Sequence, residues 1–313
     1  MSPKILSFLR RGQDHAPFPF VVGMNRSGTT LLRMMLDAHS DLTIPPETHF
    51  VPDAIKAAKE DGATPESVLA AMKEHREWGD FEISDEEMLG RFNALPRLRP
   101  GPAVRSFYDI YSERQGKPRY GEKTPTYVQK MKLIQRALPE ARFCHVIRDG
   151  RDVALSVLDR TVRDLTATDV AGRWQKKVTK AREDSPALNH YMEIRYEDLI
   201  LDTEPVLRKV CDFFELEWQD GLLTYHERSA DRLQEMARAL PGGGKAKELT
   251  VERRMATHEM TTKPPSADRV QRWRKQMTEE QRQGFEDVAG VLLSELGYPV
   301  GEPVDAAVVA QET

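Results

Sequence analysis

The chain is poor in the residues that build disulfide frameworks and metal clusters. Only two of its 313 residues are cysteine, Cys144 and Cys211. This excludes disulfide-stapled secreted scaffolds and cysteine-ligated metal modules. Cys144 lies in an apolar run, as expected of a buried small hydrophobic residue. Because sparse cysteine fits a reducing compartment, we expect the protein to work in the cytoplasm.

The chain also lacks an excess of positive charge and a long apolar run. Its 46 lysine and arginine residues are outnumbered by 50 aspartate and glutamate residues, which leaves a net charge of −4. Bulk binding of nucleic acid therefore has no electrostatic basis, and an anionic ligand has to be held by locally placed arginines. The apolar stretch within residues 1–15 is too short and too interrupted for an export signal or a stable membrane span.

What the sequence does contain is an alternation of apolar runs and helical patterns, without an internal repeat. Strands that alternate with helices predict an α/β fold, in which helices cover both faces of a central parallel sheet. We expect core strands at 18–22, 141–147 and 190–194, short strands at 41–44 and from Arg119 into a turn at Pro125, and helices at 31–37, after Asp152, and at 126–138, 168–183, 204–214 and 278–296.

The segments divide into one domain and two tails. We expect the domain at 17–300, between tails at 1–16 and 301–313, with a helical cap inserted at 51–118. Insertions of this kind usually shape a binding site. The finer predictions are cap helices at 65–77 and 85–95, a proline- and glycine-rich break at 97–102, a flexible loop at 240–247 and an irregular stretch at 257–267.

The most informative stretch is a glycine-bracketed turn between an apolar strand and a helix with an apolar face. Its sequence is Gly23-Met-Asn-Arg-Ser-Gly-Thr-Thr30. Glycine lets the backbone turn tightly, and the free N–H groups at the start of the following helix point at an anion. The spacing of the two glycines and of Thr30 matches the nucleotide-binding loop G-x-x-x-x-G-K-[ST].

The lysine of that loop is missing. Thr29 occupies its position, so the usual reach to a β- or γ-phosphate is absent. The positive charge lies inside the turn instead, at Arg26. We therefore expect the turn to bind one terminal phosphate-like group through Arg26, Ser27, Gly28, Thr29 and Thr30.

The run Arg-Ser-Gly-Thr-Thr-Leu-Leu after a strand resembles the 5′-phosphosulfate loop of sulfotransferases that use 3′-phosphoadenosine 5′-phosphosulfate (PAPS). The longer run from Arg26 through Asp37-Ala-His39 to Pro46-Glu47-Thr48 is similar to the tyrosylprotein sulfotransferases and their bacterial relatives. The resemblance implies a P-loop-like fold, PAPS as the donor, 3′,5′-bisphosphoadenosine as the product, and a hydroxyl-bearing small molecule, carbohydrate or peptide as the acceptor.

Polar, charged residues follow four of the predicted strands. Ligands of parallel α/β sheets bind at the carboxyl ends of the strands, so we expect these residues to form a single site. They are Asn25-Arg26-Ser27, Glu122-Lys123-Thr124, Arg148-Asp149 and Arg195-Tyr196.

Arg148 and Ser156 predict a second phosphate site. Arg148 ends the strand 141–147, and Ser156 lies about two turns along the helix that starts there, so a guanidinium and a hydroxyl can bind one phosphate. The pattern Arg-Asp-Gly-Arg-Asp-x-x-x-Ser is similar to the 3′-phosphate-binding segment of sulfotransferases. A nucleotide triphosphatase does not need this second site. We interpret Arg151 and Asp152 as structural.

Glu47 is the candidate general base. A carboxylate beside a phosphosulfate must stay ionised, and Arg26 and Lys123 favour the ionised form. The resemblance gives the glutamate at this place in the motif that role, which is to take the acceptor's proton as oxygen attacks sulfur. His49 is a second candidate, because the pKa of histidine suits neutral pH. The tyrosylprotein relatives have arginine at the position of His49, which speaks against protein-tyrosine specificity.

The resemblance also assigns residues around the donor. Lys123 resembles a lysine beside the transferred group, where it and Arg26 would stabilise charge on the leaving oxygen. Tyr196 resembles a tyrosine near the adenine and ribose. No paired carboxylates stand at a strand end to hold magnesium, so we expect no metal. The segment 263–274 resembles a C-terminal cofactor loop in which a cation closes over the 3′-phosphate, and the candidates are Lys263, Arg269 and Arg272.

Together these residues predict a PAPS-dependent sulfotransferase that acts on a hydroxyl, with Glu47, Arg26 and Lys123 in the catalytic roles. Two other classes stay open. A P-loop-type kinase or nucleotide-binding enzyme is disfavoured by Thr29 in the lysine position. A non-catalytic cofactor-binding protein is disfavoured because the three catalytic candidates are all present.

Overall fold

A four-stranded parallel sheet forms the centre of the computed structural model, which describes residues 15–160, 164–240, 242 and 249–305. The predicted α/β fold with a central parallel sheet is confirmed. Of the predicted core strands, the third lies one residue further along the chain than expected. In spatial order the strands are β4 (Glu122–Lys123), β1 (Phe18–Gly23), β5 (Ala141–Ile147) and β6 (Tyr191–Arg195).

Side chains of the central strands alternate between the two faces of the sheet. On β1, Phe20 and Val22 pack into one buried cluster, whereas Val21 packs into another. The register continues on β5, where Phe143 lies opposite Phe20 and Cys144 opposite Val21. Cys144 is fully buried, as predicted. Both faces are therefore apolar, which is why helices cover each of them.

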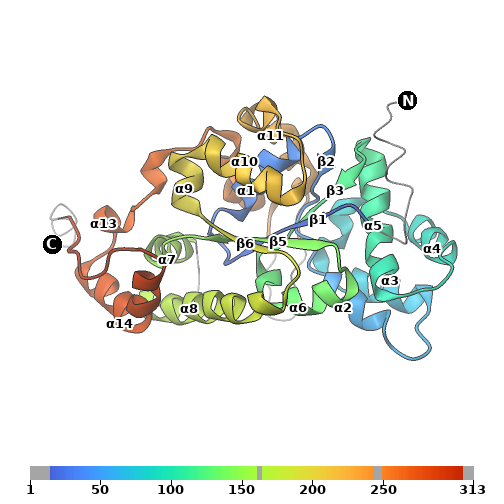
Figure 1. Ribbon diagram of the computed structural model, residues 1–313, viewed down its shortest axis with the longest axis horizontal. Coiled ribbons are helices and arrows are strands. Elements are labelled where there is room, and N and C mark those ends of the chain that lie inside the picture. Colours follow the sequence, from blue (N-terminus) through green and yellow to red (C-terminus); the bar gives the residue numbers. More distant parts are fainter. Residues whose placement is uncertain (1–14, 161–163, 241, 243–248, 306–313) are drawn as a thin grey trace.

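Helices lie on both sides of the sheet (Figure 1). Above it in this view are α1 (Thr29–Asp37), α9 (Tyr196–Leu201), α10 (Thr203–Phe214) and α11 (His226–Leu233). Below it are α6 (Met131–Ala137) and α8 (Ala167–Asp184). The short helix η3 (Pro125–Gln129) packs into the same buried cluster as α6. At the carboxyl end of β5, α7 (Gly150–Leu158) and α14 (Glu279–Glu295) pack with α8 around Trp174 and Phe285.

The cap is helical, and its core is continuous with one face of the sheet. Its aromatic side chains stack edge to face, with ring centroids 4.8 Å apart for Phe50 and Phe107, and Phe18 of β1 joins Tyr108 at 4.8 Å. The predicted break at 97–102 is too long, because Pro100 fits the first turn of a helix that continues to Gln115. The cap elements are α2 (Val51–Ala57), α3 (Pro65–Lys73), η2 (Arg76–Phe81), α4 (Asp85–Asn93) and α5 (Pro100–Gln115).

Outside the core strands the predictions fare unevenly. The short strand expected at 41–44 is present as β2 (Leu42–Thr43), which pairs with β3 (Arg119–Tyr120) in a separate two-stranded sheet. The helix expected at 126–138 is divided into η3 and α6 at Lys130, whose ψ of 3° and φ of −124° are not helical. The sequence analysis also misses α9, which begins directly after β6.

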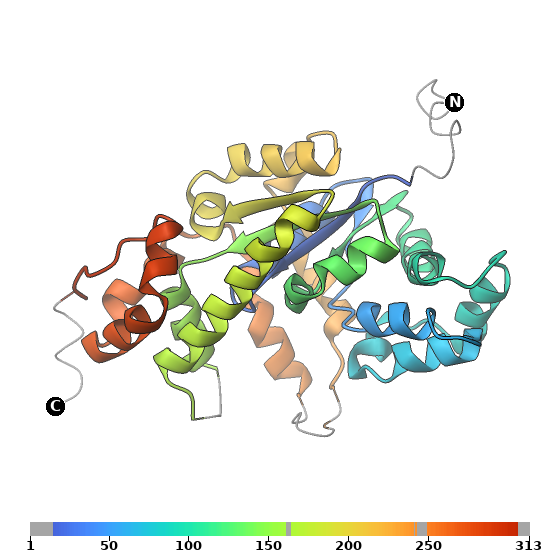
Figure 2. The same cartoon turned by 60° about the horizontal axis from the view of Figure 1, so that its bottom comes forward.

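The chain after α11 crosses the carboxyl side of the sheet, where Figure 2 shows α12 between the cap and α7. The predicted tails at 1–16 and 301–313 and the loop at 240–247 fall largely outside the described residues. No helix of the described ranges is long and apolar enough to cross a bilayer. The irregular stretch expected at 257–267 is helical up to Thr262. The remaining elements are η4 (Ser185–Ala187), η5 (Asp220–Leu222), η6 (Gln234–Met236), α12 (Val251–His258), η7 (Glu259–Thr262), η8 (Ala267–Arg269) and α13 (Trp273–Gln276).

Candidate active site

The turn between β1 and α1 has the geometry of an anion-binding loop. A backbone hydrogen bond of 3.1 Å from Ser27 N to Met24 O closes the turn. Arg26 and Gly28 both have left-handed backbone angles, with φ of 78° and 94°. Such an angle is uncommon for a residue with a side chain, and it marks Arg26 as a functional candidate. Helix α1 starts directly afterwards, so its first N–H groups remain free to bind an anion.

The two predicted phosphate sites touch each other. Arg26 Nε donates a hydrogen bond of 3.0 Å to Ser156 Oγ on α7. Arg148 Nη1, at the end of β5, donates to the carbonyl of Arg26 at 3.2 Å. Both contacts follow from the parallel sheet, which brings the ends of β1 and β5 side by side. The strand ends therefore converge on one site, as the sequence predicts.

A cavity of about 150 Å³ lies at this convergence and is strongly cationic. Burial and then the charges of Arg160 and Arg148 lower the pKa of Arg26 to about 10. Cations that destabilise one another's charged form are best stabilised by an anion placed between them. The residues that line the cavity include a single carboxylate, that of Asp159, and five arginines. The arginines are Arg26, Arg148, Arg160, Arg269 and Arg272.

Arg148 has unused hydrogen-bonding capacity. Its Nη2 donates to the carbonyl of Arg269 at 2.7 Å, and its guanidinium lies 4.4 Å from the ring centroid of Tyr196. Its Nε, however, is buried and has no hydrogen-bond partner within the described part of the chain. A buried donor without a partner is rare in folded proteins and points to a ligand. The residues present therefore fit a phosphate-bearing cofactor.

The other end of the cavity is aromatic and apolar. Tyr196 packs against the turn, and Tyr225 donates a hydrogen bond of 2.7 Å to the carbonyl of Lys263. Leu31, Ile200, Pro264 and Pro265 complete this end, which suits a planar base. Of the three cations expected to close over a phosphate, Arg269 and Arg272 line the cavity, whereas Lys263 is exposed and does not.

Glu47 and Lys123 form an ion pair beside the turn. Lys123 Nζ lies 2.6 Å from Glu47 Oε1 and 3.3 Å from Thr30 Oγ1. Lys123 is almost fully buried, whereas about a quarter of the Glu47 side chain is exposed (24%). His49 Nε2 lies 3.2 Å from the other carboxylate oxygen of Glu47. Lys123 therefore contacts both the partly exposed carboxylate of Glu47 and Thr30 of the anion-binding loop.

The three charged groups shift one another's pKa. Burial alone would raise the pKa of Glu47, but Lys123 and then His49 hold it well below its usual value of 4.5. Burial also lowers the pKa of His49, yet the hydrogen bond and charge of Glu47 outweigh burial and hold the pKa above 6.5. The pKa of Lys123 is lowered by burial. Glu47 is therefore ionised at neutral pH, as a base must be.

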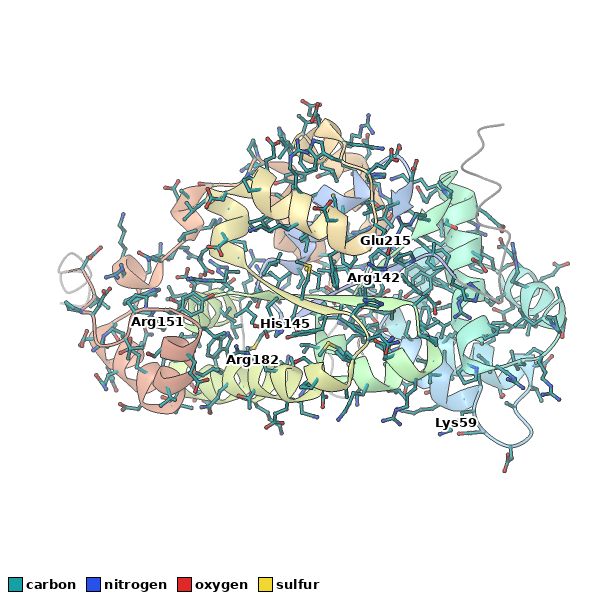
Figure 3. The ribbon with its side chains drawn as sticks, in the orientation of Figure 1. Lys59, Arg142, His145, Arg151, Arg182 and Glu215 are labelled. Atoms are coloured by element: carbon teal, nitrogen blue, oxygen red, sulfur yellow. The ribbon has the colours of Figure 1, made fainter. Side chains whose placement is uncertain are left out.

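Other charged groups serve packing. Arg151 is fully buried, with Asp149 at 2.7 Å and Glu286 at 2.6 Å, and its guanidinium lies 3.7 Å from the ring of Trp273. Figure 3 shows Arg151 among the C-terminal helices, at the end of the sheet opposite to the pair Arg142 and Glu215. Arg151 thus fixes the start of α7, which carries Ser156.

A larger cleft, of about 1040 Å³, lies at the amino ends of the strands. Its lining includes His15, Pro139 and His190, which precede β1, β5 and β6, and none of the candidate site residues. Within the described ranges, no three His, Cys, Asp or Glu side chains gather so that they could hold a metal ion.

A family model described as the sulfotransferase family matches residues 17–220, about two thirds of the chain. The chain belongs to the sulfotransferase family. The family predicted from the phosphosulfate loop and from the Arg148–Ser156 segment is therefore confirmed. The matched residues contain the turn, Glu47, Lys123 and Tyr196, but not the segment after Asp220.

The relatives of this chain include proteins named protein-tyrosine sulfotransferase. The protein-tyrosine sulfotransferase of Drosophila melanogaster is 26% identical over 300 residues, which cover 92% of this chain and 53% of the fly protein. Protein-tyrosine sulfotransferase 1 of Danio rerio is 26% identical over 219 residues, or 67% of this chain and 56% of that protein. The matches thus span little more than half the length of these two relatives.

Solved structures of sulfotransferase domains share the fold. The domain of the Synechococcus PCC 7002 olefin synthase superposes with a TM-score of 0.57 at 21% identity, covering 93% of this chain and 98% of the domain. The domain from the curacin biosynthetic pathway gives a TM-score of 0.58 at 18% identity, with coverage of 91% and 99%.

Arg160 and Tyr225 are among the cavity-lining residues that the sequence did not predict. Neither of the two follows a strand or belongs to a motif. Arg160 lies just beyond α7, and only the packing of α7 against the turn places it beside Arg26. The positions of the arginines in the sequence could not identify Arg160 as a site residue, because most arginines lie on the surface and are solvated.

Proposed function

We propose that this chain transfers the sulfuryl group of PAPS to a hydroxyl of an acceptor molecule. The observation that carries the proposal is the Glu47–Lys123 contact of 2.6 Å beside a cavity whose cationic part is lined by residues of both predicted phosphate sites. A nucleotide triphosphate would need the lysine that Thr29 replaces. A donor with a 3′-phosphate and a 5′-phosphosulfate has one anionic group for each of these two predicted sites.

The turn and α7 would hold the two anionic groups. Arg26, Ser27, Gly28, Thr29 and Thr30 would bind the 5′ end through the guanidinium, the hydroxyls and the free N–H groups at the start of α1. Arg148 and Ser156 would bind the 3′-phosphate, with Arg269 or Arg272 closing over it. The bound donor supplies the sulfuryl group and departs as 3′,5′-bisphosphoadenosine.

Glu47 would act as the general base. Its partly exposed carboxylate can accept the proton of an approaching hydroxyl, and its low pKa keeps it ionised at neutral pH. Lys123 and Arg26 would stabilise the negative charge that develops on the leaving oxygen, in a site where burial strengthens their effect. His49 would hold the second oxygen of Glu47 and so orient the base.

The acceptor class follows from the relatives and from the rim of the site. Enzymes named protein-tyrosine sulfotransferase support a phenolic peptide as the first acceptor to test. Near Glu47 the site carries His49 and the negatively charged Glu77. An acidic peptide would bind more favourably to a surface with more positive charge than these two residues supply. We therefore include neutral phenols, alcohols and sugars beside tyrosine peptides.

The test is transfer of labelled sulfate from PAPS to that panel of acceptors. Glu47→Ala should lower kcat by roughly a hundredfold or more, because a positioned base contributes about that factor. Its affinity for 3′,5′-bisphosphoadenosine should stay close to wild type. Glu204→Ala, which removes an exposed carboxylate on α10, is the matched control. Full activity of the Glu47 variant would refute the assignment of the base, and preferential binding of ATP would favour a kinase.

A further inference from the structure

Glu122 is a buried carboxylate that the proposed chemistry does not use. It precedes Lys123 on β4, and the two side chains point to opposite faces of the sheet. Lys123 faces α1 and Thr30, whereas Glu122 faces the cap, where its residue is fully buried. A buried carboxylate is costly to desolvate unless several donors satisfy it. Its neighbours therefore show what it is for.

Three hydroxyl groups surround the Glu122 carboxylate. Tyr108 on α5 donates to Oε2 at 2.5 Å, and Thr48 donates to the same oxygen at 3.2 Å. Thr124 donates to Oε1 at 2.5 Å and itself accepts a hydrogen bond of 3.1 Å from Thr48 N. Both the backbone and the side chain of Thr48 are thus attached, directly or through Thr124, to one carboxylate.

Thr48 lies between Glu47, the proposed base, and His49, which is proposed to orient that base. His49 has a left-handed φ of 55°, and a hydrogen bond of 2.6 Å from Phe50 N to Thr48 O closes a tight turn around it. Backbone strain of this kind persists only where surrounding contacts impose it.

The Tyr127 hydroxyl completes the attachment on the far side of the turn. It lies 2.9 Å from Thr48 Oγ1 and accepts a hydrogen bond of 3.0 Å from Val51 N. The single hydroxyl proton of Thr48 is donated to Glu122, so Tyr127 donates to Thr48. The chain of donors therefore runs from Val51 through Tyr127 and Thr48 and ends at the carboxylate.

We propose that Glu122 is a positioning residue that holds the Glu47–His49 turn in place through Thr48. Successive residues of the turn bind successive residues of β4, since Glu47 contacts Lys123 and Thr48 contacts Glu122. The turn is thereby attached to both faces of the strand. The inference rests on the proposed function only in naming Glu47 as the base, because the attachment itself concerns the turn.

The first test compares turnover and donor binding in variants of Glu122. Glu122→Ala is expected to lower kcat at least tenfold while the KM for PAPS changes less than threefold, since the donor contacts are on other residues. Glu122→Gln should recover most of the loss, because its carbonyl oxygen can still accept from Thr48 and Tyr108. Glu193→Ala on β6 is the matched control, because that carboxylate is also bound by a tyrosine hydroxyl, Tyr191, at 2.8 Å. Wild-type kcat in a folded Glu122→Ala protein would overturn the proposal.

The second test does not depend on activity. Glu47, Glu77 and Glu122 are the carboxylates that face His49, and together they raise its pKa. Burial raises the pKa of Glu122 to about 7, and Thr48→Val raises it further because it removes a hydrogen bond to the carboxylate. Glu122→Gln removes the charge but keeps an acceptor for Thr48, so a larger fall of the His49 pKa toward 6.5 in Thr48→Val than in Glu122→Gln, measured by NMR titration of the ring, reports a displaced turn. An unchanged His49 pKa and unchanged kcat in Thr48→Val would refute the attachment. If the wild type transfers no sulfate but the His49 pKa falls as expected, the proposed function fails and the positioning role stands.

Discussion

Gly28 meets two requirements that only glycine meets. Its φ of 94° lies in the left-handed region, and a Cβ at this position would stand 2.3 Å from Cδ2 of Tyr196. The close approach lets the aromatic ring form a wall of the cationic cavity directly beside the turn. One residue thus determines both the shape of the loop and the distance to the opposite wall.

Gly28→Ala is expected to lower the free energy of unfolding by about 2–5 kcal/mol. A left-handed alanine costs about 1–2 kcal/mol, and overpacking against Tyr196 adds about 1–3 kcal/mol. Gly62→Ala is the matched control, because Gly62 has a φ of 80° but no atom within 4 Å of its Cβ position. Urea unfolding measures both variants. Equal losses would show that Tyr196 does not restrict this position.

The opposite pKa shifts of Glu47 and His49 separate the two candidate bases. A base must be deprotonated, so with Glu47 as base kcat/KM stays high as the pH falls through 6.5 and declines only below 4.5. With His49 as base it would already decline below a pKa that lies above 6.5. The pH profile of kcat/KM measures the difference. His49→Asn should move the acid limb to higher pH, because it removes one group that lowers the pKa of Glu47.

Among the elements, α12 is tied to the cap by a buried ion pair. Arg254 donates from Nη1 and Nη2 to the two carboxylate oxygens of Asp80 on η2, at 3.0 and 2.5 Å. The two side chains are only 7% and 0% exposed. Helix α12 leads through η7 to the residues from Thr261 onward that line the cationic cavity. The pair therefore anchors the segment that forms one wall of this cavity.

Arg254→Ala should destabilise the protein by about 3–5 kcal/mol, because Asp80 is left as a buried charge without its partner. It should also raise the KM for PAPS more than it lowers kcat, since the cavity wall loosens while Glu47 stays in place. Arg208→Ala is the control, because its pair with Glu204 is about half exposed (48% and 46%), and such pairs contribute about 0.3–0.5 kcal/mol. Chemical unfolding and donor kinetics provide the readouts. Similar effects of the two substitutions would contradict the anchoring role.

At the scale of the whole molecule, the cationic cavity joins segments that are far apart in the sequence. The turn after β1, helix α7, helix α9 and the residues from Thr261 to Arg272 each contribute a wall. A ligand that binds all of them stabilises the folded state as one unit. At a concentration of about 100 times its Kd, such a ligand adds about 2.7 kcal/mol to the free energy of unfolding.

We expect this stabilisation with 3′,5′-bisphosphoadenosine and a smaller one with ATP, measured by unfolding at increasing ligand concentration. Arg148→Ala should weaken binding of the bisphosphate by about tenfold to a hundredfold, because a charge-assisted hydrogen bond contributes about 1.5–3 kcal/mol. Arg136→Ala, an exposed arginine at the far cleft, is the control. Wild-type affinity for 3′,5′-bisphosphoadenosine in the Arg148 variant would refute the proposed 3′-phosphate site.

The sequence by itself determined the parts of this protein whose signals are contiguous. The apolar runs of β1 and β5 identify central strands, because such strands are buried on both faces. The turn up to Thr30 carries its own glycine spacing, and the cap of α14 at Thr278 follows from local hydrogen bonding. Because ligands of parallel sheets bind at the strand ends, the sequence also placed Arg26 and Arg148 at one site.

Only the tertiary structure decided how distant residues combine. Arg26 and Ser156 are 130 positions apart, and Thr48 and Glu122 are 74 apart, so no local pattern relates them. Leu42 and Thr43 have strand character, but pairing with β3 rather than β1 depends on where the chain after α5 returns. Residues such as Glu122 and Arg160 acquire a role only through what packs against them. The physical reason is that hydrogen bonds and charges act over a few ångströms of space, and the fold alone fixes which residues come that close.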